Sequence, residues 1–358
     1  MSEESRRFIL RPSDVSACFA AIGRSPPLLT LFSDLPPAPL EPPAFVLDAA
    51  GDLLLPVKLI FEVLSEANMM FRLDNITSHS SLAAQSAFLA ETPEGPYVAV
   101  SKNELAWDLA LLGKRDALLA ALNETLGLAQ YKTTGDRFAV DLSLEALAVI
   151  AAMADMVTHE QARAVLERRP VNPGVISEPV SVERLAQAIR TERDHPDVRS
   201  AITRINLLTG GMINHENASD LVRQGLLFLR QEGLVDEYDA PDPSVLGLVA
   251  LFQQSSAQSG LTYIAKIGDK VVIDAQIIFH LGDYSLLGLW QFDADGRPKY
   301  IRLASIDGAG ILDSIDTVIA GLVKTGSDDP SKAGFCPDCG TKHAKDQRFC
   351  RACGRDLT

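Results

Sequence analysis

The sequence predicts an α+β fold in which two pseudo-repeated units flank a mainly helical middle region, with a small cysteine-rich module at the C-terminus. Two observations support this fold class. Apolar residues recur at helical spacing directly behind a proline at two places, at an offset of about 190 residues. At both places several strand-like runs follow, separated by turn residues. Each unit is therefore expected to contain a helix, an antiparallel meander and a closing helix.

In the first unit, Pro56 opens an amphipathic run that is typical of a helix, because proline is tolerated in the first helical turn. The expected elements are a helix over Val57–Leu64, strands over Met69–Leu73, Gln85–Ala90 and Tyr97–Val100, and a closing helix over Asp116–Leu126.

In the second unit, Asp242 followed by Pro243 indicates an N-cap and first helical turn. Gly282-Asp283 is a hairpin-type turn between two strand-like runs. The expected elements are a helix over Val245–Phe252, strands over Leu261–Ile264, Val271–His280, Tyr284–Phe292 and Tyr300–Leu303, and a closing helix over Leu312–Val323. Internal duplication explains this recurrence. The two sheets could join into one or pack as separate partners.

The middle of the chain shows helical periodicity. Leu142–Arg168 and Ser219–Gly233 are expected helices, and Ser181 is suited to cap another. The predicted division of the chain is 1–130 for the first unit, 131–240 for the helical middle, 241–324 for the second unit, 325–334 for a flexible linker and 335–358 for the cysteine-rich module.

The cysteine-rich module has the spacing of a metal site. Two Cys-x2-Cys pairs are separated by ten residues, and a glycine follows each second cysteine. A two-residue gap lets both thiolates of a pair reach one ion, and four thiolates satisfy tetrahedral Zn²⁺. A segment this short is below the ~40 residues that usually fold without a staple, so metal binding and folding should be coupled. The predicted ligands of one structural zinc ion are Cys336, Cys339, Cys350 and Cys353.

The repeated pattern Phe-Cys-x-x-Cys-Gly resembles the zinc ribbons found at the ends of many bacterial proteins. A catalytic zinc is disfavoured because four cysteines leave no open coordination position. His343, between the pairs, could compete as a ligand, although a solvated loop residue is the expected role. Cys18 stands apart and is expected to be a small buried apolar residue.

Composition narrows the class of partner. The 358-residue chain carries a formal net charge of −14. Residues 331–358 are basic, at +3, so the remaining body carries −17. An acidic body repels phosphates, so nucleic acid is an unlikely partner for it and a possible one only for the ribbon. Even the most apolar window, Leu142–Val157, contains two carboxylates, so no membrane segment is expected, and the protein is predicted to be cytoplasmic.

Catalytic signatures such as Gly-x-Ser-x-Gly, Walker-type loops and His-Glu-x-x-His do not occur in the sequence. The polar run Thr77–Ser81 and the run Asn214–Asn217 are interpreted as loop and capping residues. Gly308–Gly310 could cradle a phosphate at a helix start, but flanking aspartates favour a plain turn. His280 is expected to be a satisfied buried or edge histidine. No catalytic or cofactor-binding residue is therefore predicted.

The order of elements over residues 8–324 resembles that of the EspG family of type VII secretion chaperones. The resemblance is carried by a helix ending near Ile22-Gly23, a proline-rich crossing over Ser25–Pro43, the run Leu55–Leu64 leading into Met70–Leu73, and a second copy from Gly233 to Ile264. It implies a pseudo-twofold α+β architecture. Members of that family bind a helical partner and keep it soluble, and only the architecture is carried over to this chain.

Three functional hypotheses remain from the sequence. The favoured one is a non-enzymatic protein-interaction module, an adaptor or chaperone-like protein with a tethered zinc ribbon. The second is a transcription-associated or nucleic-acid-contacting regulator that uses the basic ribbon. The third is an enzyme with no recognisable motif. The identity of the partner and the oligomeric state stay open.

Overall fold

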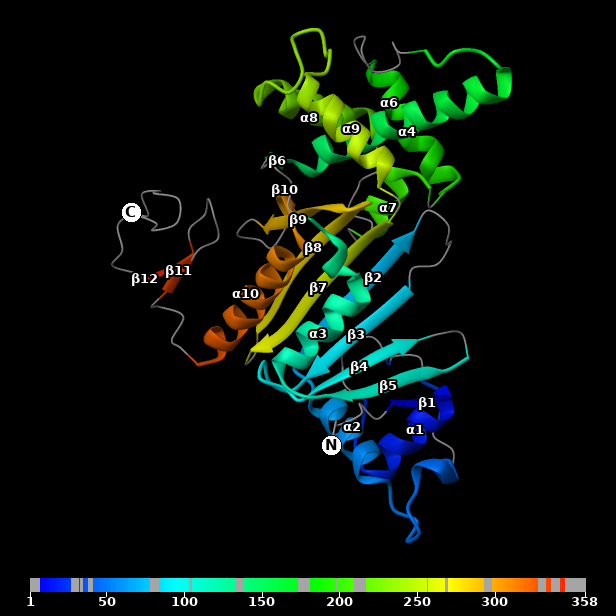
Figure 1. Cartoon of the computed structure of the whole chain (residues 1–358), viewed down its shortest axis with the longest axis vertical. Helices are drawn as coiled ribbons and strands as arrows, with labels where there is room; N and C mark the ends of the chain where they lie inside the picture. Colours follow the sequence, from blue (N-terminus) through cyan, green and yellow to red (C-terminus); the bar gives the residue numbers. More distant parts are fainter. Residues whose placement is uncertain are drawn as a thin grey trace.

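The structure is a computed structural model, shown as a ribbon in Figure 1. It describes residues 7–26, 32, 35–37, 41–77, 84–102, 105–132, 138–172, 181–197, 199–208, 217–255, 257–267, 270–292, 298–327, 333–335 and 342–344.

The same order of elements occurs twice along the chain. The first set is β1 (Arg7–Leu10), α1 (Pro12–Ala21), α2 (Leu55–Glu66), β2 (Met69–Thr77), β3 (Ala84–Ala90), β4 (Tyr97–Lys102), β5 (Trp107–Leu112) and α3 (Arg115–Leu126). The second set is β6 (Ala139–Leu142), α4 (Leu144–Glu167), α9 (Pro243–Gln254), β7 (Ala257–Ile267), β8 (Lys270–Leu281), β9 (Tyr284–Phe292), β10 (Pro298–Ile306) and α10 (Gly308–Ser327). Among the described residues, three further helices lie between α4 and α9 in the chain: α6 (Val182–Asp194), α7 (Ala201–Leu208) and α8 (Ala218–Gln231). Short 3-10 turns occur at Ala44–Val46 (η2) and Leu128–Gln130 (η3).

The ten strands that the structure describes in the body form one antiparallel sheet in the order β1-β5-β4-β3-β2-β7-β8-β9-β10-β6. The two sets meet where β2 pairs with β7, in a register that runs from Met69 opposite Ala265 to Thr77 opposite Ala257. On either side of this junction, corresponding strands occupy corresponding places. Of the two arrangements that the sequence left open, the structure has the joined sheet.

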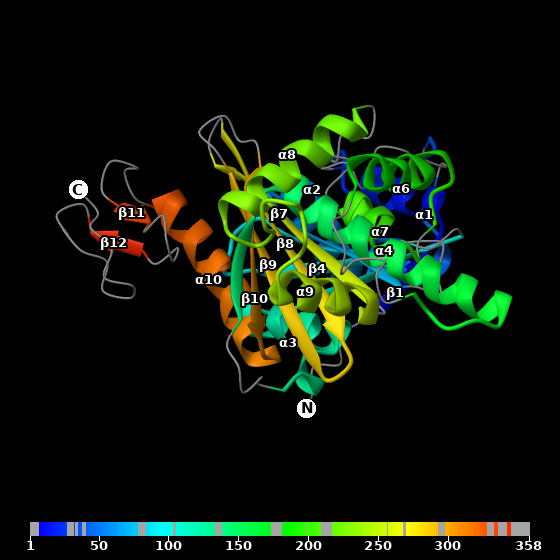
Figure 2. The same ribbon diagram turned by 90° about the horizontal axis from the view of Figure 1, so that it is seen from above.

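Helices cover both faces of the sheet. Because side chains alternate along a strand, neighbours such as Met70 and Phe71 on β2 enter different cores. On one face, α3 and α10 pack over the core that contains Phe71 and Tyr263. On the other face, α1 and α2 cover the first set of strands, and α4, α8 and α9 cover the second set around Phe279. Figures 1 and 2 show α4, α6, α8 and α9 gathered at one end of the molecule.

Local sequence signals explain the helix starts. The side chain of Asp242 accepts a hydrogen bond from the N–H of Ser244 (2.8 Å), ahead of the proline at the start of α9. The hydroxyl of Ser181 accepts one from the N–H of Arg184 at the start of α6. Both predicted caps are therefore confirmed, as are the α+β fold class and the two meanders.

Some elements escaped the sequence analysis. β1 and β6 contain four residues each, too few to show an alternation of apolar and polar side chains. β6 lies in the expected helical middle, yet it pairs with β10 at the edge of the sheet. β5 and the short helix α7 were also missed. α10 continues to Ser327, into the segment that was expected to be a flexible linker.

Close packing of α8 on α4 depends on Gly225. A Cβ atom at this position would lie 2.6 Å from the carbonyl oxygen of Glu145 and 2.7 Å from Cγ2 of Val149. Since the first of these contacts is with backbone, a side chain at position 225 would force the two helices apart.

We expect Gly225→Ala to destabilise the protein by about 1–3 kcal/mol, because overpacking forces backbone shifts. The matched control is Gly247→Ala in α9, where nothing lies within 4 Å of the added Cβ. The control should be neutral or stabilising by up to about 1 kcal/mol, because alanine favours the helix more than glycine does. Urea unfolding of the two variants measures the difference. Equal stabilities would contradict the close contact between α8 and α4.

Candidate functional site

The described part of the C-terminal module is a small hairpin. β11 (Ala333–Phe335) pairs antiparallel with β12 (Lys342–Ala344), and Gly334 lies opposite His343. Cys336 and Cys339 belong to the connection between these two strands, and Cys350 and Cys353 follow the second strand in the sequence. All four predicted zinc ligands lie outside the described residues.

The donor set of the module fits zinc. Four thiols in two pairs match the preference of Zn²⁺ for soft ligands in a closed tetrahedron. The paired strands bracket the first Cys-x2-Cys, so the chain on either side of that pair is brought together. In the part of the chain that the structure describes, no group of three or more His, Cys, Asp or Glu side chains is placed to hold a metal ion.

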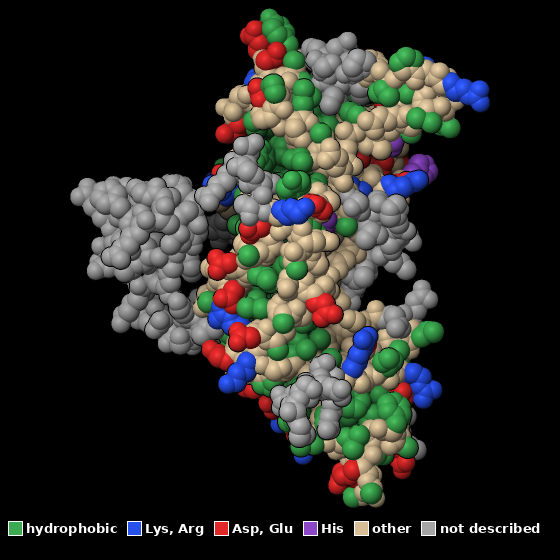
Figure 3. Space-filling model, in the orientation of Figure 1, with side chains coloured by type: hydrophobic (Ala, Val, Ile, Leu, Met, Phe, Trp, Pro, Cys, Tyr) green, Lys and Arg blue, Asp and Glu red, His purple; other side chains and the backbone are tan. Residues whose placement is uncertain are grey.

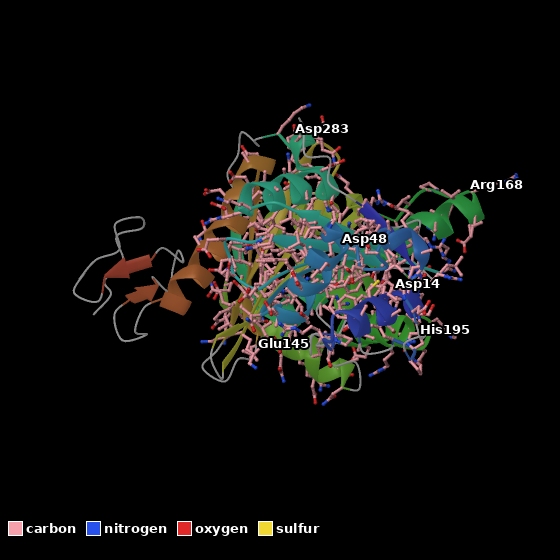
Figure 4. The ribbon with its side chains drawn as sticks, turned by 90° about the horizontal axis from the view of Figure 1, so that it is seen from below. Asp14, Asp48, Glu145, Arg168, His195 and Asp283 are labelled. Carbon is pink, nitrogen blue, oxygen red and sulfur yellow. The ribbon has the colours of Figure 1, made fainter. Side chains whose placement is uncertain are left out.

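The second half of α4 projects from the body. Its first half, Ala146–Asp155, is buried throughout, whereas Val165 and Leu166 near its end expose 76% and 84% of their surface. Figure 4 shows Arg168 at the far end of this helix, away from the sheet, and in the space-filling view hydrophobic and basic side chains meet at the projecting end (Figure 3). Two adjacent, nearly fully exposed aliphatic side chains thus lie on a helix whose other half is anchored in the core.

Ion pairs hold this helix end in place. Arg169, just beyond α4, donates to Glu160 through Nη1 (2.5 Å) and Nη2 (3.0 Å), and to Glu167 through Nε (2.6 Å). The N–H of Asn172 also donates to Glu160. These hydrogen bonds lower the pKa of Glu160 to about 2. The chain therefore folds back on the helix end, which limits fraying of the turn that carries Val165 and Leu166.

A buried polar cluster lies where the end of β8 approaches η3. Both ring nitrogens of His280 have partners: Nε2 lies 2.6 Å from the hydroxyl of Ser259, and Nδ1 contacts the hydroxyl of Tyr131. Burial lowers the pKa of His280 to about 4, so the imidazole is neutral at neutral pH. This confirms the expectation of a satisfied buried histidine. Ser259 and Tyr131 could not be predicted as its partners from the sequence, because the three residues come from distant parts of the chain.

Ser259 and His280 have the connectivity of a nucleophile and its base. Burial of the Ser259 hydroxyl argues against that role, because a substrate could not reach it: Ser259 exposes only 3% of its surface and Tyr131 7%. A substrate would have to displace η3 to reach the hydroxyl. The cluster is therefore best explained as a hydrogen-bonded support beneath η3.

A shallow depression elsewhere on the surface is lined by Pro93, Glu94, Lys114, Arg115 and Asp116. Nε of Arg115 pairs with Oδ1 of Asp316 on α10 at 2.5 Å, so its charge is already neutralised. The mixed charges around the depression select neither anions nor cations.

The remaining sequence candidates have structural explanations or lie outside the described residues. Ser78–Ser81 and Asn214–Glu216 fall outside them. Gly308 opens α10, where an added Cβ would lie 1.9 Å from the carbonyl oxygen of Leu128, so this glycine allows helix and η3 to touch. Cys18 is buried, and burial raises the pKa of its thiol to about 12, as expected for an unreactive core residue.

In the described ranges, no helix combines the length and the apolar character that crossing a membrane requires.

We expect the free energy of unfolding to fall between about pH 6.5 and about pH 4. Unfolded His280 takes up a proton at its ordinary pKa, whereas folded His280 stays neutral until about pH 4, so protons favour the unfolded state in this window. The loss should approach about 3 kcal/mol at the lower end. Urea unfolding across this range, with His280→Gln as the control, isolates the contribution. An unchanged slope in His280→Gln would contradict the assignment.

Three comparisons with known proteins were informative about the chain. A family model described as a zinc-ribbon domain matches residues 335–357, so the chain carries a zinc ribbon at its C-terminus. None of the curated proteins compared with this chain matches it. Among solved structures, the chain is similar to the Mycobacterium tuberculosis type VII secretion system chaperone EspG5, solved in complex with a PE25-PPE41 dimer. The TM-score is 0.45 and the identity 7%, over 88% of this chain and 97% of that chain.

Proposed function

We propose that the protein is a non-enzymatic adaptor, chaperone-like in that it binds another protein, and that the partner docks on the projecting end of α4. The observation that carries this proposal is the exposure of Val165 and Leu166 on a helix end that is anchored on both sides.

An exposed aliphatic pair of this kind is well suited to bind protein. Burying both side chains removes apolar surface from water, which is the main favourable term in protein association. The helix is already ordered by its buried half and by Arg169, so binding requires little further ordering of the chain. Ion-paired Arg163 and Glu167 flank the aliphatic pair with both signs of charge, which is the polar rim expected around a small apolar contact.

Charge supports a protein partner over nucleic acid. The body outside residues 331–358 carries −17, and two of the arginines at the end of α4, Arg163 and Arg169, are paired with glutamates rather than free to neutralise phosphates. The nucleic-acid alternative therefore concerns the basic zinc ribbon.

We further propose that the ribbon holds one structural zinc ion through Cys336, Cys339, Cys350 and Cys353, and that it forms a second contact with the partner. Zinc would hold together a module too short to fold alone. Internal duplication and a cytoplasmic location stay predictions.

Copurification from the native host tests the docking site. We expect a tagged full-length chain to retain a defined protein at high salt, and Val165→Ser combined with Leu166→Ser to lower its recovery at least tenfold. Leu227→Ser, which changes an aliphatic residue of α8 that is 52% exposed, serves as the control and should retain the partner. Comparison with a chain that ends at Lys324 shows whether the ribbon contributes.

Three outcomes would count against the proposal. Equal recovery with the double variant and the control would place the partner elsewhere. Nucleic acid recovered at low salt alone, and lost from the shortened chain, would favour the regulator. Turnover of a small molecule by the purified protein would favour the enzyme.

Metal analysis tests the zinc site. We expect about one zinc ion per chain, and Cys350→Ser to lose most of it, because three thiolates hold the ion less tightly than four. Cys18→Ala should keep full zinc content, since this residue of α1 is buried in the core of the body. Undiminished zinc in Cys350→Ser would contradict the assignment of Cys350 as a ligand.

A further inference from the structure

Among the described residues, part of β8 has no neighbouring strand on one side. β9 pairs with β8 only from Gln276 to Leu281, whereas β7 pairs with β8 from Lys270 to His280. Among the described strands, none pairs with Lys270–Ala275 on the side of β9. In Figure 1 the long β7–β8 hairpin runs down the middle of the molecule beside α10. In the part of the chain that the structure describes, the sheet therefore contains an open edge within its second half.

The direction of the backbone groups at this edge follows from the two hairpins. Ile267 lies opposite Lys270 across one two-residue connection, and Leu281 lies opposite Tyr284 across the other. Residues that flank such connections form the hydrogen-bonded pairs of an antiparallel ladder. Counting from both ends, the N–H and C=O groups of Val271, Ile273 and Ala275 point to the open side. The N–H of Ala275 accordingly donates to its neighbour, the side chain of Asp274 (2.8 Å), instead of a strand.

The side chains along this edge are apolar and exposed. Val271 exposes 61% of its surface, Val272 37% and Ile273 56%, although the first and third point to one face of the sheet and the second to the other. An unpaired edge with consecutive β-branched residues is a template for another strand. Natural proteins cover such edges or protect them with charges and prolines.

We propose that this edge pairs with the same edge of a second copy of the chain, antiparallel and centred on Val272. In this register Val271 of each copy lies opposite Ile273 of the other. Both residues direct their backbone groups outward, so the two pairs form four hydrogen bonds. Val272 meets its counterpart at the two-fold axis. The interface is isologous, as in most homodimers.

Charge favours the register centred on Val272 over the register centred on Ile273. Centring on Val272 places Lys270 of each copy opposite Asp274 of the other, and opposite charges across strands are favourable. Centring on Ile273 would instead place Asp274 opposite Val272. The short run from Lys270 to Asp274 is therefore complementary to itself in one antiparallel register, which favours a second copy over an unrelated extended peptide.

Two double variants test the pairing with nearly the same loss of apolar surface. Val271→Lys with Ile273→Lys places like charges opposite each other twice, and Val271→Lys with Ile273→Glu places opposite charges there. We expect light scattering after gel filtration to give a dimer mass for the wild type and the second variant, and a monomer mass for the first. Circular dichroism checks that both variants are folded.

Oxidative cross-linking provides a second measurement that does not depend on charge. Cβ atoms of a non-hydrogen-bonded antiparallel pair lie roughly 5 Å apart, so Val272→Cys should yield a cross-linked dimer. Leu166→Cys, at a more exposed position far from this edge, should not.

A monomeric wild type at about 100 μM, about a hundredfold or more above a sub-micromolar Kd, would overturn the proposal. Identical masses for the two double variants would do the same. If the wild type is monomeric and both double variants fail to retain the copurified protein partner, the edge pairs with a strand of that partner and not with a second copy.

Discussion

The antiparallel pairing of β2 with β7 is the interaction on which the rest of the structure depends. It joins two sets of elements that are far apart in the sequence into one sheet. Strands at this junction are buried in the middle of ten, with Phe71 and Tyr263 packed edge to face across it at 5.3 Å. Without the junction, each half would expose an edge strand and an unfilled part of the shared core.

Joining the halves also determines what the helices can do. α3 and α10 come from different halves but share one core on one face, and the ion pair of Arg115 with Asp316 connects them. On the other face the two helical groups belong to separate cores. In the group that covers the second set of strands, α4 is longer than the core it packs against. Its first half is anchored in that core, and its second half is exposed and can contact another protein.

Much of the fold follows from short-range signals in the sequence. Asp242-Pro243 identifies the start of α9, and the turn at Gly282 has the positive φ that glycine adopts at little cost. Long-range features do not follow in this way. Nothing local in β2 indicates that β7 is its neighbour, and β6 is too short to stand out from the helix after it.

The candidate sites show the same division. The zinc ribbon was predictable because four cysteines at fixed spacing carry their chemistry in the sequence, and the family match to residues 335–357 shows that domain. The assignment of the four cysteines as ligands stays a prediction. Exposure of Val165 and Leu166 was not predictable, because a helix of the same pattern could equally have been covered. Whether the body is one cooperative unit centred on β2 and β7 can be measured directly by native-state hydrogen exchange. The account predicts that amides of both strands exchange together, only through global unfolding. Faster exchange at the junction than within either half would contradict it.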